Sequence, residues 1–111
     1  MKKYSIGLDY GTNSCRALIV DLSDGNEIAS ALFDYLSGES GVLIDHKDPN
    51  LARQNPQDYL DGIASTVTEA ISKARENNPS FDSETVVGIG VDTTGSSPLP
   101  VNEEGVPLSF L

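Results

Sequence analysis

The sequence predicts one small α/β domain, built from an antiparallel three-strand meander, a crossover helix and a parallel central strand. Three features support this: short apolar segments separated by turn signals, an apolar stripe at helical spacing, and a continuous apolar run near the C-terminus. A helical connection between two strands of one sheet brings the second strand in parallel to its neighbour. We expect 111 residues to form a single hydrophobic core.

The meander occupies the first third of the chain. Tyr4 to Asp9 is predicted as the first strand and Cys15 to Asp21 as the second, with a tight turn between them. The turn signal Ser23 to Asn26 leads into a third strand, Glu27 to Leu36, where polar and apolar residues mix as on a half-buried surface. Ser37 to Gln54 is rich in Gly, Ser, Asp and Asn and is predicted as a long loop.

A helix is predicted to follow this loop. Asn55 is a capping residue, Pro56 suits the first helical position and Asp58 complements the helix dipole. Glu69 and Lys73 are spaced as an outward-facing pair, and Asn77-Asn78-Pro79 ends the helix. Apolar residues at helical spacing form the core-facing stripe: Leu60, Ile63, Val67, Ala70, Ile71 and Ala74.

The last third of the chain contains the fourth strand. Val86 to Val91 is apolar with two glycines, which predicts a central strand buried on both faces. A small-residue loop, Thr93 to Ser97, follows, and then a short strand, Leu99 to Val101. Asn102 to Gly105 is predicted as a turn, and Val106 to Leu111 as a further extended segment. This order of elements is that of a ribonuclease-H-like half-domain with one bare sheet face.

Composition limits the partners and the compartment. Seven basic and seventeen acidic residues give a formal charge of −10, which repels nucleic acid and anionic membranes. The single cysteine, Cys15, allows no internal disulfide and suits a reducing setting, where it packs as a small buried residue. No stretch approaches the roughly 20 apolar residues of a membrane span, so a cytoplasmic location is expected. The lone histidine, His46, is assigned no role.

The segment Ile6 to Arg16 has the residue types of a phosphate site. Asp9 ends a strand and offers a hard oxygen ligand that suits Mg²⁺, while Gly11 lets successive N–H groups point at one anion. Arg16 offers a planar, permanently charged fork to a terminal phosphate. Side-chain donors stand between them: Thr12, Asn13 and Ser14. An ordinary hairpin turn remains the alternative, because Asp, Gly and Asn favour turns in any case.

Two nucleotide-binding motifs are excluded. The chain has no G-x-x-x-x-G-K-[ST], so it is not a P-loop protein. Gly88 to Thr93 begins like a dinucleotide fingerprint, but Thr93 stands where the third glycine belongs and the segment lies inside a strand.

The string Asp9-x-Gly11-Thr12-x-Ser14-x-Arg16 resembles the first phosphate motif of the FGGY carbohydrate kinases, which belong to one superfamily with hexokinase, actin and the chaperone ATPases. Three later stretches resemble the ribulokinase branch of that family: Ala52–Tyr59, Val87–Pro98 and Asn102–Leu108. The resemblance spans nearly the whole chain, which would be the N-terminal part of a typical member. Residues 1–111 would then be a partial FGGY domain, with the rest of it and the C-terminal domain absent.

This resemblance implies transfer of the ATP γ-phosphate to L-ribulose, giving L-ribulose 5-phosphate, with ATP and Mg²⁺ as cofactors. Asp9 would position Mg²⁺, Gly11 to Ser14 would line the phosphate path, and Arg16 would neutralise charge on the transferred group. Thr94, Gly95 and Ser96 would border the sugar, although this loop is also explained as a tight connection after a core strand. The general base and the adenosine pocket would lie downstream.

Several alternatives stay open. Kinases of ribitol, D-ribulose and xylulose share the first motif, and the chaperone-type ATPases have a similar first hairpin. A short binding or assembly module is a further alternative, since the bare sheet face and Phe110-Leu111 would favour self-association. We expect the chain alone to have no kinase activity.

Overall fold

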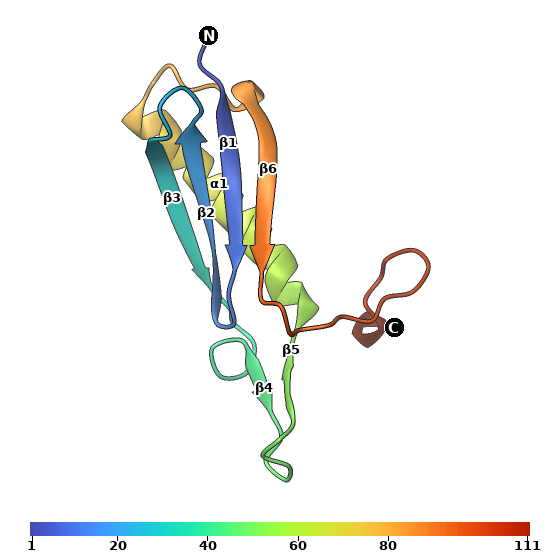
Figure 1. Cartoon of the computed structure of the whole chain (residues 1–111). Helices are drawn as coiled ribbons and strands as arrows, with labels where there is room; N and C mark the ends of the chain where they lie inside the picture. The colour runs from blue at the N-terminus through green and yellow to red at the C-terminus, as the bar shows by residue number, and fades with distance from the viewer.

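The computed structural model describes residues 1–111 and has a four-stranded sheet with one long helix on one face (Figure 1). Strands β1 (Tyr4–Tyr10), β2 (Ser14–Asp21) and β3 (Glu27–Asp34) form an antiparallel meander. Helix α1 (Pro56–Asn77) then crosses over to β6 (Val86–Thr93), which pairs in parallel with β1, so the strand order is β3-β2-β1-β6. The predicted fold class is confirmed.

The core lies between α1 and the sheet. Alternate residues of the strands point toward the helix, and those of β1 include Tyr4, Ile6 and Leu8. The helix approaches closely because it presents small residues: a Cβ atom at Gly62 would collide with the Cys15 sulfur. The buried core residues are Tyr4, Ile6, Leu8, Ala17, Ile19, Ala29, Ala31, Ala70, Ala74 and Phe81.

The predicted helix start is confirmed, with one addition. The Asn55 side chain accepts a hydrogen bond of 3.0 Å from the Gln57 N–H, as a cap should. Asp58 lies in the first turn but is buried, and its carboxylate accepts bonds from the Ser37 N–H and hydroxyl at 3.3 and 3.0 Å. It therefore fastens the segment after β3 to the helix start.

The apolar stripe of α1 is only partly as predicted. Ala70 and Ala74 are fully buried, and the three β-branched residues of the stripe pack partly buried against the core. Leu60, however, is 54% exposed, so its prediction as a core residue is wrong. The buried line runs instead through Gly62 and Thr66, one helical row away, because the closest approach to β2 requires small residues.

The prediction for the last strand is wrong in one respect. β6 is an edge strand in this chain, and Val87, Ile89 and Val91 are 59, 56 and 60% exposed. The reason is the course of α1, which packs mainly on β2 and β3 and leaves β6 uncovered beyond its first residue, Val86.

The segment Ser37–Gln54, predicted as a loop, contains a two-stranded hairpin, which corrects that prediction. Strands β4 (Val42–Ile44) and β5 (Ala52–Gln54) pair antiparallel beyond the lower end of the main sheet (Figure 1). Each has only three residues, too few for a period-two pattern to stand out in the sequence.

The C-terminal segment has less strand than predicted. Leu99–Val101 contributes only an isolated bridge between Val101 and Pro107, and Val106–Leu111 ends in the 3-10 helix η2 (Leu108–Phe110) instead of an extended segment. The turn at Asn102–Gly105 is confirmed, with Gly105 at a φ of 78°. A second short 3-10 helix, η1 (Ser83–Thr85), precedes β6.

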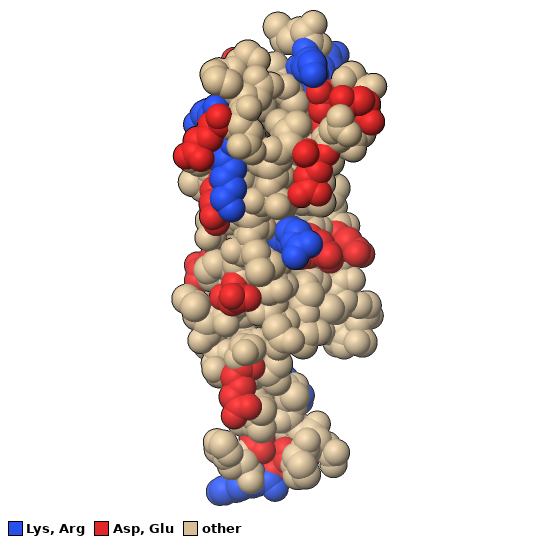
Figure 2. Space-filling view, turned by 90° about the vertical axis from the view of Figure 1, so that its left-hand side faces the viewer, with Lys and Arg blue, Asp and Glu red and all other residues tan.

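Charged side chains are dispersed over the side of the molecule that carries β3. Figure 2 shows acidic groups interspersed with basic ones there, without a continuous basic area. None of the helices combines the length and the apolar character that crossing a bilayer demands.

Candidate functional site

Two loops meet at the lower edge of the main sheet. Loop 11–13 follows β1 and loop 94–97 follows β6, and because these strands are parallel neighbours, both loops leave the same edge (Figure 1). The space outside the carboxyl ends of parallel strands is where ligands bind in open α/β sheets. The structure thus brings together the two loops that the sequence singled out.

Loop 11–13 is held by its carbonyl oxygens. The Gly11 carbonyl accepts a bond of 3.0 Å from the Tyr35 hydroxyl, and the Asn13 carbonyl accepts one of 3.0 Å from the Tyr35 N–H. The Thr12 carbonyl accepts one of 3.0 Å from Nε2 of Gln54. The N–H groups of Thr12 and Asn13 donate to no other group of the chain. Unpaired, neighbouring N–H groups on a fixed turn suit an anion such as phosphate.

Three tyrosines support this loop from behind. The Tyr59 ring packs edge-to-face against Tyr10 and Tyr35, with ring centroids 5.2 and 5.4 Å apart, and the Tyr10 hydroxyl donates to the Tyr59 carbonyl at 3.1 Å. Burial raises the pKa of all three hydroxyls, which keeps them protonated as donors. Sequence reasoning missed this cluster, because the three residues are far apart in the chain and follow no periodicity.

A row of charged residues crosses the sheet face opposite α1. Asp9 of β1 pairs in register with Arg16 of β2 on one side and with Asp92 of β6 on the other. All three side chains are exposed, and the two ion pairs of the chain lie elsewhere. The predicted neighbours Asp9 and Arg16 are therefore adjacent, and Asp92 joins them; no sequence signal linked Asp92 to this motif.

The acidic pair fits a magnesium ion that keeps part of its water shell. Asp9 and Asp92 offer carboxylate oxygens from adjacent strands, which are the ligands that Mg²⁺ prefers. The chain holds no group of three or more metal-ligating side chains. Mg²⁺ is commonly held by one or two carboxylates together with waters and phosphate oxygens, so this donor set is sufficient.

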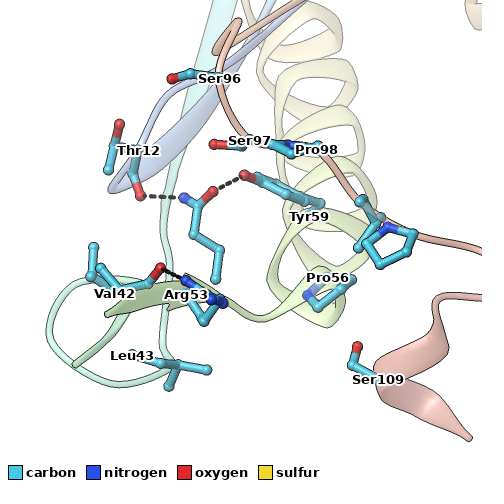
Figure 3. A pocket seen from close by; sticks show the side chains of 14 residues that line it. Thr12, Val42, Leu43, Arg53, Pro56, Tyr59, Ser96, Ser97, Pro98 and Ser109 are labelled. Carbon is cyan, nitrogen blue, oxygen red and sulfur yellow. Dashed lines mark hydrogen bonds between the residues drawn. The ribbon is translucent and has the colours of Figure 1, made fainter. Parts of the chain in front are cut away.

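A cleft of about 770 Å³ opens beside loop 11–13 (Figure 3). Thr12 and Ser96 line it from the two loops, and the β4–β5 hairpin, the start of α1 and the C-terminal segment form its other walls. Arg53 is the one charged residue of the lining, so most of the polar groups present are hydroxyls and amides, which suit a neutral polyhydroxy ligand. The lining consists of Thr12, Val42, Leu43, Ala52, Arg53, Gln54, Pro56, Tyr59, Ser96, Ser97, Pro98, Leu99, Pro100 and Ser109.

The other predicted sugar-side residues stand apart from this lining. Thr94 and Gly95 do not line the cleft, although the Thr94 hydroxyl donates to the Ser97 hydroxyl at 3.2 Å and so fixes one that does. Cys15 is buried against the helix, as predicted, and burial raises the pKa of its thiol, which opposes a nucleophilic role. His46 lies exposed in the hairpin turn.

Comparison with known proteins gives a consistent result. The profile of the FGGY family of carbohydrate kinases, N-terminal domain, matches residues 4–110. The chain is 39% identical over 110 residues to a ribulokinase from Vibrio parahaemolyticus and 39% identical over 117 residues to one from Halalkalibacterium halodurans, which cover 99% and 98% of it. A ribulokinase from Geobacillus thermodenitrificans is 40% identical over 114 residues, covering 96%.

The fold has a match among solved structures as well. A crystal structure of gluconate kinase from Lactobacillus acidophilus superposes with a TM-score of 0.72 at 18% identity over 97% of the chain, which shows a shared fold. The chain corresponds to 18–19% of the length of the three ribulokinases and to 19% of the gluconate kinase chain.

Proposed function

Because this chain belongs to the FGGY family of carbohydrate kinases, we propose that the intact protein transfers the γ-phosphate of ATP to L-ribulose and forms L-ribulose 5-phosphate. The fold agrees with this reaction, since it resembles that of a gluconate kinase. The choice of sugar rests on ribulokinases, which are 39–40% identical to the chain over nearly its whole length.

The observation that carries the proposal is the geometry of loop 11–13. Its carbonyl groups are bonded to the protein behind it, which leaves the N–H groups of Thr12 and Asn13 free for phosphate oxygens. The Gly11 N–H donates to the Ser14 carbonyl at 2.8 Å, so Gly11 would shape the turn, while Asn13 and Ser14 would complete the phosphate path with side-chain donors. An ordinary hairpin turn does not need three separate bonds from distant residues to its carbonyls.

The charged row supplies the electrostatic part of phosphoryl transfer. Arg16 carries no ion pair and would neutralise negative charge on the phosphoryl group as it moves. Asp9, with Asp92 beside it, would hold Mg²⁺ through its water shell, and the ion would supply positive charge to offset the negative charge of the phosphates. The chain carries a net charge of −10, which repels ATP. Arg16 and a bound Mg²⁺ would offset this repulsion at the site.

The cleft is the proposed place of the sugar. Ser96 and Ser97 face it together with Thr12, so a sugar there would lie next to the phosphate loop. Hydroxyl groups and an amide can both donate to and accept from the hydroxyls of a ketopentose. Thr94 and Gly95 would act by shaping the loop that carries these serines.

The chain by itself is proposed to be inactive. It corresponds to less than a fifth of the length of the ribulokinases it resembles, and no residue in it is proposed as the general base. Phosphorylation of a pentulose by residues 1–111 alone, with ATP and Mg²⁺, would contradict this proposal.

The test of the proposed function is a substrate panel for the intact protein. ATP-dependent phosphorylation would be measured with L-ribulose, D-ribulose, D-xylulose, ribitol and glycerol. We expect L-ribulose to have the highest kcat/KM. A preference for another of these compounds would retain the kinase and reject the sugar assignment. ATP hydrolysis that no sugar stimulates would reject the kinase and favour a chaperone-type ATPase.

A further inference from the structure

Each free N–H group of loop 11–13 shares a peptide group with a bonded carbonyl. In a trans peptide the carbonyl oxygen and the N–H hydrogen lie in one plane and point in opposite directions. The Gly11 carbonyl belongs to the same peptide group as the Thr12 N–H, and the Thr12 carbonyl to the same group as the Asn13 N–H. A bond that holds one of these carbonyls therefore also sets the direction of the N–H group across the plane.

The peptide group between Thr12 and Asn13 is held by Gln54. Nε2 of Gln54 donates to the Thr12 carbonyl at 3.0 Å, and Oε1 accepts a hydrogen bond from the Tyr59 hydroxyl (Figure 3). Because a backbone carbonyl can only accept, the amide presents its nitrogen to the loop and its oxygen to Tyr59. A donor on the carbonyl also polarises the peptide group, which makes the Asn13 N–H a stronger donor.

The amide of Gln54 is anchored at points outside the loop. Its backbone ends β5 and directly precedes the capping residue Asn55. The Tyr59 ring packs edge-to-face against Tyr10 and Tyr35, which limits the movement of the hydroxyl that holds Oε1. The side chain that contacts the loop is therefore fixed by the end of a strand and by the start of α1.

We propose that Gln54 is a positioning residue, which directs the N–H group of Asn13 toward a phosphate of the nucleotide and is itself oriented by the Tyr59 hydroxyl. The inference rests on the proposed function of loop 11–13 as the phosphate site. No other group of the chain bonds the Thr12 carbonyl, so without the amide its peptide group loses this preset direction. The nucleotide must then order the peptide group as it binds, which lowers its affinity.

The test replaces the donor and keeps the shape of the side chain. Gln54→Glu retains an oxygen that the Tyr59 hydroxyl can bond, but it puts a charged oxygen, which cannot donate, against the Thr12 carbonyl. Gln54→Met removes the donor without adding charge. Gln57→Glu is the matched control, because it makes the same change of charge in the first turn of α1, where the Gln57 amide donates to Asp61 at 2.8 Å and not to the loop.

Two dissociation constants would be determined by calorimetry in the intact protein: that of a non-hydrolysable ATP analogue with Mg²⁺ and that of adenosine. We expect Gln54→Glu to raise the Kd of the analogue at least about tenfold, and Gln54→Met to raise it by a smaller factor. The Kd of adenosine should not change, since adenosine carries no phosphate. Tyr59→Phe, which leaves the amide able to donate but less well oriented, should raise the Kd of the analogue least. Gln57→Glu should leave both constants as they are, and thermal melts check that every variant is folded.

Three results would overturn the inference. The first is an unchanged Kd of the analogue in both Gln54 variants, and the second is an equal loss of affinity for adenosine. The third is a rise in Gln54→Glu with none in Gln54→Met, because the new carboxylate would then act only by repelling the phosphates. All three leave sugar phosphorylation by the unaltered protein intact, whereas failure of the proposed function appears as an absence of phosphorylated sugar in the substrate panel.

Discussion

The two sides of loop 11–13 are built differently. The carbonyl groups of the loop accept three hydrogen bonds from Tyr35 and Gln54. By contrast, the N–H groups of Thr12 and Asn13 have no partner in the chain, and the neighbouring charged residues Asp9, Arg16 and Asp92 make no ion pair. One side therefore contributes to stability, and the other is available for ligands. The difference indicates that loop 11–13, although composed of common turn residues, is suited to ligand binding because other side chains bond its carbonyl groups and so fix its conformation.

The largest effect on activity is expected from Asp9→Asn, which changes one of the unpaired charged residues next to loop 11–13. The change keeps the size of the side chain and removes the charge proposed to hold Mg²⁺, so kcat of the intact protein should fall about 100-fold or more. The melting temperature should not fall, because Asp9 makes no ion pair. A variant that keeps full activity at limiting Mg²⁺ would remove Asp9 from the metal site.

On the tied side, Gly41→Ala should destabilise the protein without touching a ligand. Gly41 has a φ of 90°, and a Cβ there would lie 2.7 Å from the Tyr35 side chain. We expect a loss of about 1–3 kcal/mol in the free energy of unfolding, measured by denaturant titration. Gly25→Ala is the matched control, since Gly25 also has positive φ but no neighbour within 4 Å, and it should cost less.

Tyr35→Phe is a milder test of the same side. It removes the hydrogen bond to the Gly11 carbonyl and keeps the ring that packs on Tyr59. The expected loss is about 1 kcal/mol in the free energy of unfolding, with a rise in the KM for ATP from a less ordered loop. If stability falls while the KM for ATP stays the same, the hydrogen bond from Tyr35 to the Gly11 carbonyl contributes to stability only. The proposal that bonds to the loop carbonyls prepare the loop for ATP would then be weakened.

Much of this architecture follows from the sequence, because local patterns determine it. The strands of the meander, the Asn55 cap and the adjacency of Asp9 and Arg16 each follow from neighbouring residues and strand register. The burial of β6 was predicted wrongly, because the pattern of a strand shows its apolar faces and not what covers them in this chain. The hairpin β4–β5 was missed because its strands are short.

The support of the loop could not be predicted for a different reason. Tyr35, Gln54 and Tyr59 reach loop 11–13 from separate elements, and each contact depends on the three-dimensional course of the chain. Asp92 belongs to the charged row only because β6 pairs with β1 in that register. Such contacts leave no periodic signal in a single sequence.

The smallest effect concerns the end of the sheet away from the loop. Hydrogen bonds from Ser23 and Lys2 lower the pKa of Asp21 to about 2, below its ordinary value. A lowered pKa in the folded state stabilises the protein above the unfolded pKa, and this contribution is lost as the pH falls toward 2. Asp21→Asn should therefore be less stable at neutral pH, and the difference should shrink in thermal melts as the pH is lowered from the ordinary aspartate pKa toward 2. A difference that stays constant over this pH range would assign the effect to packing.

The most direct test of the central claim compares Arg16→Ala with Arg75→Ala in the intact protein. Both changes remove an exposed arginine, one beside loop 11–13 and one in the last turn of α1. L-Ribulose-dependent ATP consumption would be measured together with the melting temperature. If the free side of the loop binds the transferred phosphate, Arg16→Ala lowers kcat/KM by about 100-fold or more at an unchanged melting temperature, and Arg75→Ala does not. Equal activity in the two variants would contradict the assignment of this loop as the phosphate site.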